Sequence, residues 1–212
     1  MSRIARSSLI IAVFFGVDKI LGLLRTVFFN RTFNPAERDV FFVSNNIPDL
    51  LSAIISGGAL GIALIPVLTE HLQLEGRMAA WKLFSQIVNL AFVVTAAIAL
   101  LIILLADPLI QHVIAPGFND PAKWDLAVKL MRLDLLAIMI FSVSGLVMAG
   151  LQANQHFLFP AMAPGLYNTG QIIGILFLAP RFGIYGLAFG VILGVILHLS
   201  IQIPGLLHHK FH

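Results

Sequence analysis

The sequence predicts an all-α membrane protein that crosses the bilayer several times. Of its 212 residues, 59% are hydrophobic and only 11% are charged, and the mean hydropathy is +0.97. An ordinary soluble domain carries about 25% charged residues, so one large globular core does not explain this composition. The apolar residues also fall into long runs, and a helix of about 20 residues is enough to cross the hydrocarbon core of a membrane.

Six such runs predict six transmembrane helices within a single unit that covers residues 1–212. Arg3 and Arg6 precede the first run, so the positive-inside rule predicts a cytoplasmic N-terminus. No small-residue cleavage site closes that run, and we expect it to remain as a helix rather than act as a signal peptide. The predicted helices cover approximately residues 8–29, 39–70, 83–106, 125–151, 160–178 and 184–206.

The first predicted helix carries charges inside its apolar run. Asp18, Gly22 and Arg25 are spaced by four and three residues, so they share one helix face and the acid can partner the base. Lys19 lies about a quarter-turn away from Asp18. The alternative for Arg25 is that its long side chain reaches the membrane interface.

The second predicted helix has a polar stripe and several residues that interrupt helices. Pro48, Gly57, Gly58 and Pro66 all fall within it. An isolated charge that faces lipid costs roughly 2.5–3.5 kcal/mol, so an acid in mid-span favours a helix that lines a wet cavity. The alternative is a polar seam that only holds helices together. The stripe follows intervals of four, three and four residues and consists of Asn45, Asp49, Ser52 and Ser56.

The third and fourth predicted helices differ in polarity. The second half of the run at residues 83–106 is apolar all round, which predicts a helix that faces lipid. The fourth run carries Asp134, with Lys129 and Arg132 both within reach. We therefore predict a structural ion pair for Asp134, with ion coupling as the alternative.

The last two predicted helices carry packing signals. Asn168 and Gln171 are one turn apart and are predicted to bond to a neighbouring helix. In the sixth run small residues and then polar ones recur every four positions, which predicts a close-packing face. His198 is predicted to be a hydrogen-bonded structural residue, and a proton relay is the alternative. The members of this face are Gly186, Gly190, Gly194, His198 and Gln202.

Several classes of function lack support in the sequence. There is no cysteine, so disulfides and thiolate metal sites are excluded. The net charge is only +3, and no cluster of Lys and Arg indicates nucleic-acid binding. We find no nucleophile paired with a base, no metal-ligand cluster and no nucleotide-binding loop. We therefore expect a protein that is not an enzyme and that holds neither a cofactor nor a metal.

A set of short motifs runs along the whole chain: KILGLLR at 19–25, DVFF at 39–42, PDLL at 48–51, Gly58-Ala59, IPV at 65–67, APGF at 115–118, Phe157, PAMAP at 160–164 and Asn168. These motifs resemble those of the N-terminal six-helix lobe of the MurJ (MviN) lipid II flippases, within the multidrug/oligosaccharidyl-lipid/polysaccharide exporter superfamily. The order of the motifs over six predicted helices makes the resemblance specific.

The resemblance implies a fold in which this chain is one lobe of a two-lobe flippase. Its implied activity is to move a lipid-linked diphosphate glycan, the peptidoglycan precursor lipid II, across the bacterial cytoplasmic membrane by alternating access, for cell-wall synthesis and cell shape. Coupling to the membrane potential or to a monovalent ion is implied in place of a cofactor. Asp18 and Asp134 are the implied supporting or ion-coupling residues. The implied substrate-binding residues are Lys19, Arg25, Asp39, Asn45, Asn46, Asp49, Ser52 and Ser56.

The chain also departs from the family. Ser52-Ala53 and Ser56-Gly57 stand where many members have paired Arg and an acid, and Asp49 replaces an amide, so the second helix is less basic. Two alternatives therefore stay open for the function. One is an exporter of another polyprenyl-linked oligosaccharide or an ion-coupled drug antiporter, and the other is a non-transporting membrane scaffold.

Family members are about twice as long as this chain or longer. Because an alternating-access site normally lies between two halves, we expect either that the sequence is a fragment of a longer transporter or that two copies assemble face to face.

Overall fold

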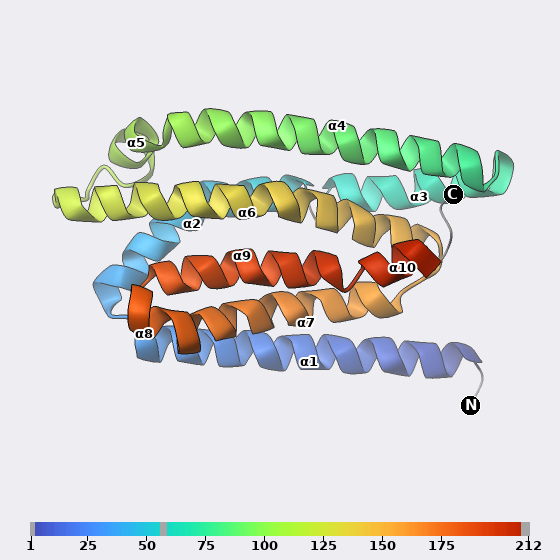
Figure 1. Cartoon of the computed structure of the whole chain (residues 1–212), viewed down its shortest axis with the longest axis horizontal. Coiled ribbons are helices and arrows are strands. Elements are labelled where there is room, and N and C mark those ends of the chain that lie inside the picture. Colours follow the sequence, from blue (N-terminus) through green and yellow to red (C-terminus); the bar gives the residue numbers. More distant parts are fainter. Residues whose placement is uncertain (1–2, 56–58, 209–212) are drawn as a thin grey trace.

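The computed structural model describes residues 3–55 and 59–208, and every regular element in that part of the chain is helical. Figure 1 shows the long helices lying side by side along the long axis of the molecule. The all-helical fold predicted from the composition is confirmed. The long helices are α1 (Arg3–Thr32), α2 (Pro35–Ile55), α3 (Ala59–Leu74), α4 (Arg77–Leu104), α6 (Pro121–Ala153), α7 (Leu158–Ile173) and α9 (Tyr185–Ser200).

Shorter elements connect or extend these helices. A π-helical turn, η2 (Gly174–Leu178), prolongs α7, and a second one, η1 (Ile110–Ile114), follows α4 and α5. Such turns often occur near functional sites. The remaining short helices are α5 (Ala106–Leu109), α8 (Ala179–Phe182) and α10 (Ile203–His208).

Within residues 3–55 and 59–208, three helical segments are long and apolar enough to cross a membrane, by length and composition: Arg77–Leu104, Pro121–Ala153 and Tyr185–Leu207. The prediction that the chain has six transmembrane helices is not tested by this criterion and stays a prediction. Two helices, α2 and α3, occupy the second predicted span at residues 39–70. Ser56 and the tandem Gly57-Gly58 lie between them, outside the described residues.

Helix α6 is the centre of the bundle. It packs against α2, α3, α4 and α9, and Figure 1 shows it between α4 on one side and α9 on the other. In its most apolar 18-residue window 61% of the residues are buried, compared with 11% in α4. Helix α4 therefore leaves most of its apolar surface outside the bundle, as expected for a helix that faces lipid.

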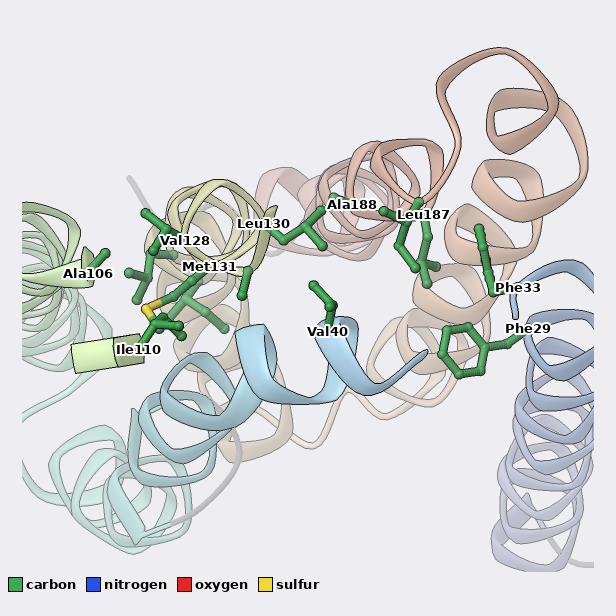
Figure 2. Close-up of a cluster of buried hydrophobic side chains, with 14 of the residues drawn as sticks. Phe29, Phe33, Val40, Ala106, Ile110, Val128, Leu130, Met131, Leu187 and Ala188 are labelled. Carbon is green, nitrogen blue, oxygen red and sulfur yellow. The ribbon is translucent and has the colours of Figure 1, made fainter. Parts of the chain in front are cut away.

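A cluster of large side chains joins one end of the bundle. Phe29 of α1 and Phe33, which directly follows α1, belong to the same buried cluster as Val40 of α2, Leu130 of α6 and Leu187 of α9 (Figure 2). All five side chains are at most 8% exposed. Lipid tails are as apolar as these side chains, so the hydrophobic effect does little to drive membrane helices together. Close van der Waals packing of this kind stabilises their association instead.

The corner between α1 and α2 is closed by reciprocal hydrogen bonds. The Asn34 side chain accepts from the backbone N–H of Glu37 at 3.0 Å, and the Glu37 carboxylate accepts from the backbone N–H of Asn34 at 2.9 Å. This arrangement is a capping box, with Pro35 as the first residue of the helix. Arg38 donates to Asn30 at 2.7 Å across the same corner. The two helices are thereby fixed at the point where the cavity described below begins.

Helices α7 and α9 make the closest contact in the bundle. A Cβ atom built on Gly170 would lie 2.3 Å from the Cα of Gly194, and one built on Gly174 would lie 2.5 Å from the Cα of Gly190. Only glycine permits backbones to approach this closely. The close-packing face predicted from the four-residue spacing in the sixth run is confirmed.

Candidate functional site

A cavity of about 220 Å³, partly open to the surroundings, lies between α1, α2, α7, η2 and α9. Phe29 and Leu187 belong both to its wall and to the packed cluster of Figure 2, so the cavity lies directly beside that cluster. Its lining residues are Arg25, Thr26, Phe29, Asn30, Phe41, Phe42, Asn45, Asp49, Tyr167, Gln171, Ile175, Leu187 and Val191.

Arg25 provides the positive charge of this lining. Its side chain is half-buried, and its guanidinium donates to the Gln171 side-chain oxygen at 3.4 Å, a long and therefore weak bond. No carboxylate in the described chain lies within 4.0 Å of it. A guanidinium presents several donors in a planar fork that suits phosphate or carboxylate oxygens. Arg25 is thus placed to bind an anion that enters the cavity.

Asp18 and Lys19 lie away from the cavity lining. The Asp18 carboxylate accepts from the Asn168 amide at 2.9 Å and lies 3.4 Å from the Lys19 ammonium. The prediction that Asp18 partners Arg25 is therefore wrong. The Asn168 amide and the Lys19 ammonium both lie close to Asp18, whereas Arg25 lies two helical turns further along α1 and is not within 4.0 Å. Lys19 is 79% exposed at its side chain, so it supplies no charge to this cavity.

The predicted bonds of Asn168 and Gln171 to a neighbouring helix are confirmed. Both side chains lie on α7 and both reach α1, where one bonds to Asp18 and the other to Arg25. These two contacts fix the rotation of α1 about its own axis. They therefore determine which charges of α1 face the cavity.

The polar stripe of α2 is only partly at the cavity. Asn45 and Asp49 line it, while Ser52 is half-buried outside the lining. Asp39 and Asn46 are exposed and also lie outside the lining. Ser56 lies outside the described residues. Of the eight residues predicted to bind substrate, the structure brings together three: Arg25, Asn45 and Asp49.

The predicted ion pair of Asp134 is not formed. Lys129 bonds to Asp125, and Arg132 donates to Asp107 at 2.7 Å and to a backbone carbonyl of α4. Residues two or five positions apart do not share a helix face, so both bases point away from Asp134. Asp134 is 2% exposed, and neither of its carboxyl oxygens meets hydrogen-bond geometry with any described group.

Four polar lining residues were not among the predicted site residues. Thr26 and Asn30 continue a four-residue spacing that begins at Gly22, and Gln171 lies one turn after Tyr167. This periodicity is a usable signal. Without the fold, however, nothing indicates that these faces of α1 and α7 meet α2.

Among the described residues no group of three or more His, Cys, Asp or Glu could hold a metal ion.

Comparison with known proteins gives a consistent result. A family model described as "Lipid II flippase MurJ" matches residues 28–212. The "Lipid II flippase MurJ" of Burkholderia cenocepacia is 29% identical over 95% of this chain and 40% of its own length. The "Probable lipid II flippase MurJ" of Buchnera aphidicola subsp. Acyrthosiphon pisum is 32% identical over 89% of this chain and 37% of its own length.

A solved structure gives the same result at the level of the fold. The chain described as "Lipid II flippase MurJ, inward closed conformation" superposes with a TM-score of 0.78 and 26% identity, over 96% of this chain and 43% of that one. The present chain thus spans about two fifths of the length of the relatives that it matches.

Proposed function

Because the chain belongs to the lipid II flippase MurJ family, we propose that it forms one lobe of a membrane transporter that moves lipid II from the inner to the outer leaflet for cell-wall synthesis. The observation that carries the proposal is Arg25 in the cavity wall, which has no carboxylate within 4.0 Å in the described chain and is only weakly bonded to Gln171. A lipid-linked precursor carries a diphosphate, and a fixed guanidinium in a sheltered cavity suits that group.

The rest of the lining matches an amphipathic ligand. Thr26, Asn30 and Asn45 offer hydrogen-bonding groups for phosphate or sugar oxygens, beside the rings of Phe41 and Phe42. A drug-sized site has about 300–1,000 Å³, so 220 Å³ holds part of a headgroup rather than a whole lipid-linked disaccharide. We propose that a second lobe, from further chain or from another copy, provides the facing wall.

The proposal extends to location and energy coupling. We place the chain in the bacterial cytoplasmic membrane with its N-terminus in the cytoplasm, because Arg3 and Arg6 precede the first helix. It acts as a transporter and not as an enzyme. The membrane potential or a monovalent ion, rather than a cofactor, drives the cycle, since intramembrane charges such as Asp18 and Asp49 respond to both.

The negative charge of Asp49 makes the cavity less suited to a diphosphate and so affects which lipid-linked substrate it favours. Its carboxylate lies in the same cavity as Arg25 and offsets part of that residue's positive field. This keeps open a second candidate, an exporter of a different polyprenyl-linked oligosaccharide. Leaflet-accessibility assays with lipid II and with other polyprenyl-linked glycans separate the two.

The test is complementation in cells that are depleted of their own lipid II flippase and express this protein. Arg25→Ala should abolish growth and leave lipid II in the inner leaflet, while the membrane level of the protein is unchanged. Arg31→Ala is the matched control, because Arg31 is an exposed base in the last turn of the same helix and lies outside the lining. Normal growth with Arg25→Ala would contradict a cationic diphosphate site.

A further inference from the structure

Asp134 is an acid for which the proposed function gives no role. It lies in the part of α6 that packs against α2, is 2% exposed, and has both carboxyl oxygens buried and unpartnered in the described chain. The other intramembrane acid of comparable burial, Asp18, has two polar partners. Burial of an isolated carboxylate is strongly unfavourable, so Asp134 requires something that neutralises it.

Among the described residues, no basic side chain forms an ion pair with Asp134. Asp49 and Asn45 of α2 and Tyr167 of α7 face it, and Arg25 of α1 lies farther away, where it acts on Asp49 and Tyr167. Helix α9 also packs against α6, but its His198 bonds to Ser144 and Gln202. The Asn45 amide group already donates to the Phe41 carbonyl at 3.0 Å. The nearest charge thus has the same sign as an ionised Asp134.

We propose that Asp134 is a proton-binding site, with Asp49 as the group through which the proton reaches the cavity. A proton removes the unpaired charge and makes the carboxyl a donor, for which the Asn45 side-chain oxygen is a suitable acceptor. A metal ion would need several more oxygen ligands, and no metal-binding group of acids is present among the described residues. A proton needs no additional space in this packed region.

The path of the proton follows from the lining of the cavity. The O–H bond at Asp134 breaks, and its electron pair stays on Asp134 as a carboxylate. The proton forms a new O–H bond at Asp49, and from there it passes to water in the cavity. Asp49 can serve as this relay, because its charge acts on Asp134 and its side chain lines the cavity. Neither carboxyl oxygen of Asp134 is hydrogen-bonded to Asp49, so a water molecule from the cavity carries the proton between the two acids. The two acids therefore bind one proton as a pair.

Proton binding is coupled to anion binding in the cavity, and this part rests on the proposed function. An anion held at Arg25 adds negative charge beside Asp49 and so favours uptake of a proton by the acid pair. By linkage, the proton must strengthen anion binding by the same factor. The proton site itself does not depend on which anion is bound, or on whether one is bound.

Infrared difference spectroscopy of the whole protein in lipid nanodiscs tests the site directly. The wild type should show the C=O stretch of a protonated carboxylic acid at neutral pH, sensitive to ²H₂O and lost at alkaline pH. Asp134→Asn should remove this band. Asp125→Asn should keep it, since Asp125 is exposed on the same helix and bonded to Lys129. Asp49→Asn should keep the band, because Asp134 rather than Asp49 carries the proton.

Three outcomes would overturn the proposal. The first is the absence of the band from the wild type at neutral pH, a result that needs no variant to fold. The second is a band that survives in Asp134→Asn. The third is a protein whose thermal stability depends on sodium rather than choline chloride and loses this dependence in Asp134→Asn, which would assign a metal cation to the site. Failure of the Arg25 complementation test would leave all three measurements intact.

Discussion

Two polar regions of the bundle differ in how their groups are bonded. In the packing region, where α9 contacts α6 and α7, Ser144 lies 2.6 Å from His198 and accepts from Gln202 at 3.0 Å. The Gln202 amide also donates to the His198 carbonyl at 2.8 Å, and all three side chains are buried. At the cavity, Arg25 has one long bond, and neither carboxyl oxygen of Asp134 behind the wall meets hydrogen-bond geometry with any described group.

We interpret the packing region as a structural site and the cavity as a ligand-binding site. Polar groups that bond to one another within a packed interior stabilise one arrangement of helices, and their loss weakens the fold. Polar groups left with weak partners beside a cavity are available to a ligand. The following predictions test this separation, beginning with the largest expected effect.

The glycine contact of the packing region should be the most sensitive point of the fold. Gly170→Ala would place a Cβ 2.3 Å from the backbone of Gly194, where nothing flexible can move aside. We expect α7 and α9 to separate and little monodisperse protein to be recovered from detergent. Gly16→Ala is the control, because a Cβ there meets nothing within 4 Å. Equal recovery of the two variants would mean that the helices have room to shift.

The buried bonds of the packing region should contribute stability rather than activity. Ser144→Ala removes the hydroxyl shared by His198 and Gln202 and leaves the His198 ring nitrogen with only its longer contact to Gln202 at 3.2 Å, and the loss of such buried hydrogen bonds costs about 0.5–1.5 kcal/mol each. Thermal unfolding in detergent measures the loss, and growth in the complementation assay should be retained wherever the protein still folds. A fully stable variant without transport would instead assign His198 to the transport cycle, as in the proton-relay alternative.

Removal of the acid from the cavity should strengthen anion binding. Asp49→Asn takes a negative charge from the neighbourhood of Arg25, and partly solvated charge interactions of this kind change affinity by roughly two- to five-fold. Titration with inorganic diphosphate measures the change. Arg25→Ala combined with Asp49→Asn should abolish the gain. If the gain persists in the double variant, the anion binds elsewhere.

Lys19 should have the smallest effect of the charged residues in α1. Its side chain is 79% exposed and lies outside the cavity lining, so Lys19→Ala should change stability by no more than about 0.5 kcal/mol. Growth should be reduced far less than by Arg25→Ala. If both variants lose growth equally, Lys19 contributes to the substrate site from outside this cavity, through contact with the facing wall.

Part of the site could be predicted before the fold was known. Charges inside apolar runs pointed to Arg25 and Asp49, and helical periodicity placed Asn45 on the face of Asp49. Neither observation indicated that Tyr167 and Gln171, more than a hundred residues later, complete the same wall. The partners of Asp18 and Arg132 were also predicted incorrectly, because spacing along one helix does not reveal that Asn168 of α7 and Asp107 of α5 lie closer. The partner of Lys129 was missed although Asp125 precedes it by four residues on the same helix.

The sequence by itself determined that this protein is a helical membrane protein and that its sixth run has a close-packing glycine face. Both properties depend on composition and on the local period of a helix, which the order of residues contains directly. Only the tertiary structure decided which charges face the cavity, that Lys19 lies outside its lining, and that Asp134 is buried without a partner. Those properties depend on the rotation of each helix about its axis, and contacts with distant helices set that rotation.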